Sequence, residues 1–176
     1  KLANFIKGIV PNYILRTLRP LTIRFVRVAP RDHKINQEPE FFTPSEEKLK
    51  VALSSLEWNL TSDTPLVSVI IPVHNQFVHT VRAVWSVAHQ TNFPLEIIIA
   101  DDCSTDDTHH FFECIPAINY FQNEVNQGFL RTCNLAASRA KGKFLFFLNN
   151  DTFVHDNALA ELISVFNEKP HAGLVG

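Results

Sequence analysis

The chain has 176 residues, with 16 Lys and Arg against 18 Asp and Glu, and 45% of its residues are apolar. That length suits one domain with an appendage, and 15 phenylalanines with only 19% charged residues exclude general disorder. The three cysteines contain no CxxC pair and leave one over, which excludes a disulfide scaffold, so we expect a reducing, cytoplasmic compartment.

Targeting signals are missing from the sequence. No uncharged apolar stretch reaches the roughly 18 residues that a transmembrane helix needs, and no secretory leader opens the chain. Methionine is absent, so residue 1 is not a natural start. We therefore expect a piece of a longer protein.

The beginning of the chain is basic. Residues 1–34 hold eight of the 16 basic residues and one acid, Asp32, which leaves eight basic and 17 acidic residues in the remainder. Apolar residues recur there at near-helical spacing: Ile6, Ile9, Val10, Tyr13, Ile14 and Leu18. Such a segment suits peripheral contact with the inner face of an anionic membrane, or packing on a neighbouring part of the full-length protein. The acidic remainder argues against nucleic acid as a partner.

A second unit follows this arm, which we assign to residues 1–42. Thr43, Pro44 and Glu46 fit the first positions of a helix, as a capping box with proline where no N–H is needed. Residues 61–65 are a polar linker, and we place a domain boundary there. The sequence thus predicts a helix and linker over 43–65 and the main domain over 66–176.

From residue 66 onward, short apolar runs alternate with amphipathic helices. Strands are predicted over 67–73, 95–100, 118–121, 143–148 and 172–175. Helices are predicted around 81–88 and over 105–113, 128–140 and 159–166. This alternation predicts an α/β fold built from right-handed βαβ units, with a mostly parallel sheet and flanking helices.

Polar clusters follow three of the predicted strands: Pro72-Val73-His74-Asn75, Asp101-Asp102-Cys103-Ser104 and Asn149-Asn150-Asp151-Thr152. Ligands of open parallel sheets bind beyond the carboxyl ends of the strands, so we expect these clusters to face one crevice. Each cluster taken alone also fits an ordinary turn or helix cap. Their shared edge is what favours a binding site.

Such an edge suits a bound diphosphate. Carboxylates repel phosphate directly but can approach it through a divalent cation, Mg²⁺ or Mn²⁺, which uses one or two protein carboxylates together with phosphate oxygens. Asp151 is the expected ligand of that cation, and Asp102 is better suited to accept an N–H from a flat base. Arg131 fits either a phosphate contact or a solvated helix surface.

Other chemistries lack their motifs. The sequence has no GxGxxG dinucleotide fingerprint, no GxxxxGK phosphate loop and no GxSxG nucleophile elbow. Eight histidines are present, yet no HxxxH or CxxC spacing indicates zinc.

Four stretches together carry a family resemblance: Val67–Asn75, Ile97–Asp106, Asn126–Phe129 and Leu148–Thr152. In this order and spacing they resemble the inverting family 2 glycosyltransferases of the GT-A fold, over residues 66–176. The resemblance implies a Rossmann-like GT-A fold that is truncated before its acceptor half.

The resemblance also implies a nucleotide-diphosphate sugar donor of the UDP, GDP or dTDP type. The base would be held by the loop after the first strand and by Asp102. Asn149-Asn150-Asp151 stands where the family carries its Asp-x-Asp element, and Asp151 matches the metal-binding carboxylate. An Asn replaces a second Asp, so either metal affinity is lower or Asn150 contacts the sugar. His74 replaces an aromatic residue that is often found there.

Gly128 and Arg131 fall in the region that lies near the diphosphate and sugar in relatives. The expected donor-binding residues are Pro72, Val73, His74, Asn75, Asp101, Asp102, Gly128, Arg131, Asn150 and Asp151.

The implied function is transfer of a sugar to the hydroxyl of a glycan or lipid-linked acceptor, in polysaccharide or glycolipid biosynthesis. The family's general base, an Asp or Glu, lies after the metal element, and the chain ends about 25 residues beyond Asp151. We therefore expect no catalytic base and no transfer activity in this piece. One alternative is a non-catalytic nucleotide-sugar-binding or scaffolding module of the same fold. A nucleotidyltransferase is disfavoured, because Gln76-Phe77-Val78 stands where its Gly-rich loop would be.

Overall fold

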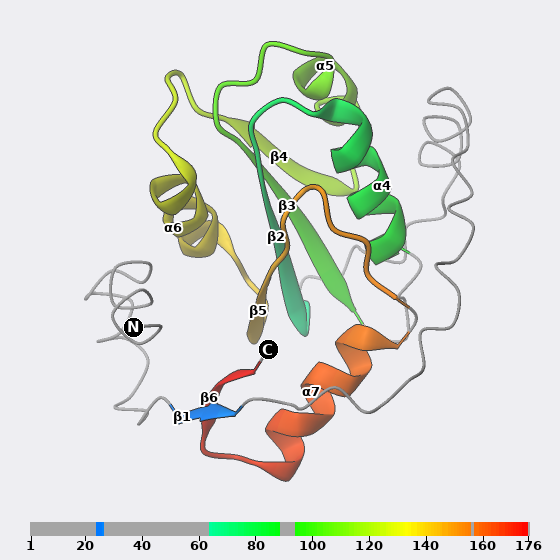
Figure 1. Cartoon of the computed structure of the whole chain (residues 1–176), viewed down its shortest axis with the longest axis vertical. Helices are drawn as coiled ribbons and strands as arrows, with labels where there is room; N and C mark the ends of the chain where they lie inside the picture. The colour runs from blue at the N-terminus through cyan, green and yellow to red at the C-terminus, as the bar shows by residue number, and fades with distance from the viewer. Residues whose placement is uncertain (1–23, 27–63, 89–93, 156, 176) are drawn as a thin grey trace.

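The structure is a computed structural model that describes residues 24–26, 64–88, 94–155 and 157–175 (Figure 1). The helix predicted from Thr43 and most of the basic arm lie outside these residues. The fold below therefore concerns mainly the predicted domain from residue 66 onward.

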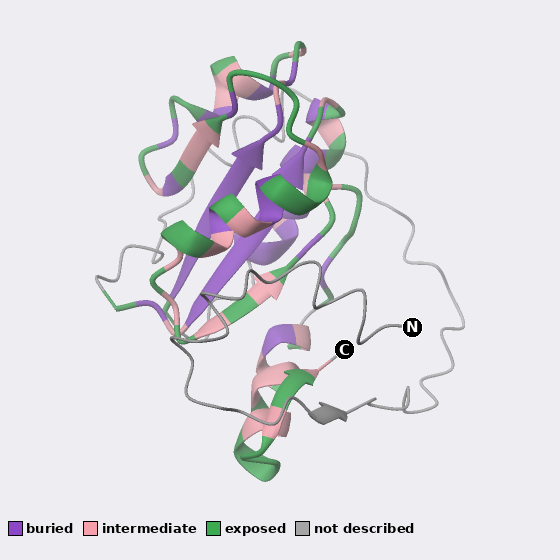
Figure 2. Ribbon diagram, turned by 90° about the vertical axis from the view of Figure 1, so that its left-hand side faces the viewer, coloured by how far each residue is buried: buried purple, intermediate pink, exposed green. Residues whose placement is uncertain are grey.

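Four parallel strands form the central sheet, in the order β4-β3-β2-β5. Their bounds are Val67–Val73 for β2, Leu95–Asp101 for β3, Ile118–Gln122 for β4 and Phe144–Phe147 for β5. All seven positions of β2 and of β3 are buried, as a sheet covered on both faces requires (Figure 2). The predicted parallel α/β architecture is confirmed.

Helices cover both faces of this sheet. Their bounds are Phe77–Ala88 for α4, Thr108–Phe112 for α5, Phe129–Arg139 for α6 and Ala158–Glu168 for α7. Odd-numbered residues of β2 and β3 pack in one core with side chains of α4, α5 and α7, whereas Ile70, Ile98 and Ala100 pack with Ala136 of α6. In Figure 1, α6 lies on one side of the sheet and α4 on the other.

Helix α5 is shorter than the predicted segment 105–113. The residues before it form a turn in which Asp101 Oδ1 accepts the Ser104 N–H and Asp106 Oδ2 accepts the Phe77 N–H. Because these side chains hold residues 104–107 in the turn, the helix begins only at Thr108.

The predicted last strand is present but pairs elsewhere. Strand β6 (Ala172–Val175) pairs in parallel with β1 (Arg24–Val26), a short strand that the sequence did not predict, in a separate two-stranded sheet. Strand β5 consequently lies at the edge of the main sheet, and its Leu145 and Phe147 remain exposed. Within the described part of the chain, no helix combines the length and apolar character needed to cross a bilayer.

Candidate functional site

The loops after β2 and β3 lie side by side. The two strands run in register from Val67 opposite Leu95 to Val73 opposite Asp101, so they end together. Asn75 links the loops in both directions: its N–H donates to Ser104 Oγ at 2.7 Å, and its Oδ1 accepts the Thr105 N–H at 2.8 Å. Two of the three predicted clusters therefore form one hydrogen-bonded surface.

His74 reinforces this connection. Its Nδ1 lies 2.9 Å from the Asp102 carbonyl oxygen, so this hydrogen bond requires a proton on Nδ1. Asn75 and Gln76, which follow, both have φ of 61°, in the left-handed region that Asn tolerates better than most residues. The chain thus turns sharply from β2 into α4, and the His74 ring stays exposed.

The loop after β5 joins the same surface through Asn150. The Asn150 side-chain amide donates to the Asn75 carbonyl oxygen at 3.4 Å and to Thr80 Oγ1 at 3.2 Å. All three sequence clusters therefore meet through the β2–α4 loop. Asp151 follows directly and is exposed.

The Asp102 carboxylate accepts several hydrogen bonds from the β4–α6 segment. The residue is 4% exposed. Its Oδ1 accepts from Asn123 Nδ2 at 2.9 Å and from the Gln127 N–H at 2.7 Å, and its Oδ2 accepts the Gly128 N–H at 2.8 Å. Burial raises the pKa of Asp102, but these hydrogen bonds outweigh it and lower the pKa below 3.8. The residue therefore stays charged.

Asp102 also caps the start of α6. Gly128 stands immediately before this helix with φ of 83°, a conformation that favours glycine. An anion at a helix N-terminus is stabilised by the helix dipole. The bonds from Gln127 and Gly128 thus bind the β4–α6 loop to the turn after β3.

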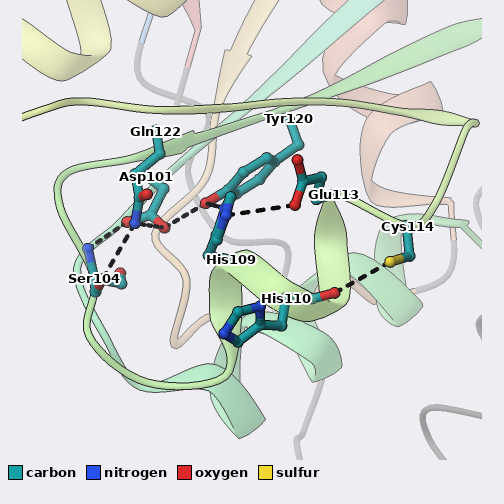
Figure 3. A network of polar contacts seen from close by, with 8 residues as sticks. All are labelled: Asp101, Ser104, His109, His110, Glu113, Cys114, Tyr120 and Gln122. Carbon is teal, nitrogen blue, oxygen red and sulfur yellow. Dashed lines mark hydrogen bonds and ion pairs between the residues drawn. The ribbon is translucent and has the colours of Figure 1, made fainter.

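Asp101 faces the interior. It is fully buried, its Oδ1 accepts the Ser104 N–H at 2.8 Å, and its Oδ2 accepts from the Tyr120 hydroxyl at 2.7 Å and from Gln122 Nε2 at 3.3 Å (Figure 3). Asp101 therefore shapes the turn that carries Asp102.

The remaining predicted residues differ in exposure. Pro72 and Val73 are buried in β2, where the Val73 carbonyl oxygen accepts the Asp102 N–H at 2.7 Å. Arg131 is exposed on α6. Within the described residues no group of three or more His, Cys, Asp or Glu side chains is arranged to hold a metal ion. Asp151 is an exposed carboxylate.

Sequence reasoning missed Asn123 and Tyr120. Asn123 follows β4 directly, and its amide donates to Asp102 and to Thr132 Oγ1. The rule that selected the other clusters, polar residues just after a strand, would have found it. Tyr120 lies within β4, where an aromatic residue indicates only packing.

A scan against family models matches "Glycosyl transferase family 2" over residues 68–176. The chain is 35% identical over 109 residues to the GalNAc(5)-diNAcBac-PP-undecaprenol beta-1,3-glucosyltransferase of Campylobacter jejuni, covering 59% of this chain and 35% of that protein. Its fold resembles that of S. aureus TarS 1-349, with a TM-score of 0.52 and 28% identity over 58% of this chain and 32% of that one.

A second structural neighbour is the mannosyltransferase PcManGT from Pyrobaculum calidifontis in complex with GDP-Man and Mn²⁺. The TM-score is 0.52 with 21% identity, over 66% of this chain and 37% of that one. These likenesses confirm the GT-A fold class. The chain spans 14% to 42% of the length of eight curated relatives that it matches. Since the family model covers more than half of the sequence, the chain belongs to glycosyl transferase family 2.

Proposed function

We propose that this chain is the donor-binding part of an inverting, metal-assisted glycosyltransferase that takes its sugar from a nucleoside diphosphate sugar. One observation carries the proposal: hydrogen bonds join the loops after β2, β3 and β5 at the carboxyl edge of the sheet. Open α/β sheets bind nucleotides at this edge. The GDP-Man held by PcManGT supports the same donor class.

The nucleoside base is assigned to the surface between His74 and Asp102. The charged Asp102 carboxylate suits an N–H of a flat base, and His74, which is hydrogen-bonded to the Asp102 carbonyl oxygen, is exposed beside it. A charged Asp102 is the better acceptor, and its lowered pKa keeps it charged at neutral pH. Asp101, Asn123 and Gln127 hold this surface in place.

The diphosphate is assigned to the side of Asp151 and Arg131. One exposed carboxylate with amide neighbours fits a Mg²⁺ or Mn²⁺ ion whose other ligands are phosphate oxygens and water. Such an ion would neutralise the charge that develops on the leaving diphosphate. Because the described residues form no complete ligand set, the ion should bind together with the donor rather than before it.

The acceptor side belongs to the remainder of the enzyme. An inverting displacement needs a carboxylate base within hydrogen-bond reach of the acceptor hydroxyl. We assign this base to sequence beyond the chain, and the acceptor to a glycan or lipid-linked glycan, as in the name of the Campylobacter relative. The protein would then act in polysaccharide or glycolipid biosynthesis, at the cytoplasmic side of a membrane.

Isothermal titration calorimetry with UDP, GDP and dTDP, each with and without Mn²⁺, tests the donor assignment. We expect one of the three to bind, and to bind at least tenfold more tightly with Mn²⁺. Absence of binding by all three would contradict the proposal. Residues 1–176 alone should transfer no sugar.

A second candidate, a non-catalytic nucleotide-sugar-binding module, is favoured by the Asn that replaces a second Asp before Asp151. The full-length protein separates the two functions. Transfer of labelled sugar to any acceptor supports the enzyme, whereas donor binding without transfer or hydrolysis supports the module.

A further inference from the structure

A series of polar contacts runs from the surface of α5 to the turn that carries Asp102 (Figure 3). Glu113 Oε2 lies 3.4 Å from His109 Nε2, and His109 Nδ1 lies 3.2 Å from the Tyr120 hydroxyl. That hydroxyl donates to Asp101 at 2.7 Å, and Asp101 holds the Ser104 N–H. We call these four side chains, Glu113, His109, Tyr120 and Asp101, the α5 relay.

Proton counting shows that the α5 relay depends on the charge of His109. Tyr120 has one proton, and it donates that proton to Asp101. His109 must therefore donate from Nδ1 to the Tyr120 oxygen if both contacts are to be kept. A neutral ring with its proton on Nδ1 turns a lone pair toward the Glu113 carboxylate.

The other neutral tautomer of His109 also cannot keep all the contacts of the α5 relay. With the proton on Nε2, His109 binds Glu113, but its Nδ1 lone pair then competes with Asp101 for the Tyr120 proton. Only the imidazolium donates at both nitrogens and leaves the Tyr120–Asp101 bond undisturbed. Protonation of His109 therefore fixes every donor in the α5 relay.

The surroundings keep Tyr120 a donor. Burial, followed by the hydrogen bond to Asp101, raises the pKa of Tyr120 well above 10.0, so the phenol stays protonated at physiological pH. Glu113 and Asp106 add negative charge around it, and the His110 ring lies 5.4 Å from the His109 ring. Helix α4 packs against this helix through Phe77, which is uncharged.

We propose that His109 and Tyr120 are positioning residues for the nucleotide-binding surface, and that protonation of His109 tightens nucleotide binding. The effect passes through Asp101 to Ser104, whose hydroxyl accepts the Asn75 N–H, and to Asp102 next in sequence. This inference rests on the proposed function for its consequence, but the proton-dependent contact exists without a ligand. Gln122 Nε2 also donates to Asp101 Oδ2 and to the Ser104 carbonyl oxygen. Because these bonds hold the same turn, we expect only a modest effect of His109 protonation on nucleotide affinity.

The first arm of the test needs no nucleotide. The chain has two tyrosines, so Tyr13→Phe leaves Tyr120 as the single signal of ¹³C-tyrosine labelling. We expect the Tyr120 resonance to shift when the pH is lowered from 8 to 5. The shift should persist in His110→Gln, the matched control on the same helix, and vanish in His109→Gln. A Tyr120 chemical shift that does not change with pH, or the same change in His109→Gln, would overturn the proposal.

The second arm measures the dissociation constants of UDP, GDP and dTDP with Mn²⁺ at pH 6 and pH 8. Relative to His109→Gln, the parent should gain about two- to fivefold in affinity at the lower pH, the size of one partly exposed charge contact. Tyr120→Phe should lose this gain, and His110→Gln should keep it. The nucleotide phosphates and the metal ion titrate equally in the parent, His109→Gln, Tyr120→Phe and His110→Gln proteins. Their contribution to the pH dependence of affinity therefore cancels in the comparison.

Equal pH dependence in all four proteins would refute the positioning role. If no nucleotide binds, that role falls together with the proposed function. The pH dependence of the Tyr120 resonance separately decides whether the proton-dependent contact exists.

Discussion

A carboxylate holds a distant loop at each end of the central strands. We call the amino-terminal ends of these strands the amino edge and their carboxyl-terminal ends the carboxyl edge. At the amino edge, Glu96 Oε1 accepts from Ser68 Oγ at 2.5 Å and from the Lys141 N–H at 2.6 Å, while Oε2 accepts from Asn119 Nδ2 at 2.9 Å. At the carboxyl edge, Asp102 likewise accepts one side-chain amide and two backbone N–H groups. Each carboxylate fixes a distant loop to the sheet.

The two edges differ in the space around their glycines. A Cβ on Gly142 would collide with the Ser68 backbone N, so the amino edge is closed by direct packing. Gly128 has nothing within 4 Å of the corresponding position and is required only by its positive φ. The amino edge is closed by packing, whereas the carboxyl edge is open beside Gly128.

The largest expected effect is on the amino edge. Glu96→Ala leaves three buried or partly buried donors without their acceptor, and we expect a loss of about 3 kcal/mol in the free energy of unfolding. Urea denaturation measures this loss, with the exposed Glu168→Ala as control. Nucleotide affinity of the remaining folded protein should be unchanged. A loss below about 1 kcal/mol would show that the hydrogen bonds of Glu96 do not stabilise the amino edge as described.

Asp102→Asn should cost about 2 kcal/mol at neutral pH, because the new amide group must face an N–H donor of the β4–α6 loop. The folded-state pKa of Asp102 lies below 3.8, so its stabilisation is present above that pH and is lost as pH falls through the folded value. The stability gap between parent and variant should therefore narrow between pH 5 and pH 3, as urea midpoints can show. The exposed Asp107→Asn provides the control, and a constant gap would contradict the prediction.

Asp151→Ala tests the open part of the carboxyl edge. The residue is exposed, so unfolding should change by no more than about 0.5 kcal/mol. Mn²⁺-dependent nucleotide affinity should fall at least tenfold, which is about 1.4 kcal/mol. Calorimetry compares the affinity of Asp151→Ala with that of Glu161→Ala, which removes an exposed carboxylate on α7. Unchanged affinity would remove Asp151 from the metal site.

Local patterns predicted the sheet and the edge at which the polar clusters meet. Runs rich in β-branched residues, such as Val67–Val73, indicate a strand with both faces buried, and the structure gives that strand the predicted bounds. The polar clusters follow from parallel topology alone, since all carboxyl ends meet at one edge. The three joined loops confirm that expectation.

Features that depend on long-range geometry were not predictable. The three residues Arg24–Val26 carry no periodic signal, and their pairing with β6 links segments almost 150 residues apart. The bonds from Gln127 and Gly128 to Asp102 use backbone N–H groups, which every sequence has. The inward position of Asp101 depends on Tyr120 and Gln122 from the neighbouring strand.

A crystal of the chain soaked with the tightest-binding nucleotide diphosphate and Mn²⁺ tests the central claim most directly. We predict the base between His74 and Asp102, the ion within ligand distance of Asp151, and the diphosphate between them. A nucleotide bound at the amino edge, or an ion held away from Asp151, would contradict the assignment of the carboxyl edge as the donor site.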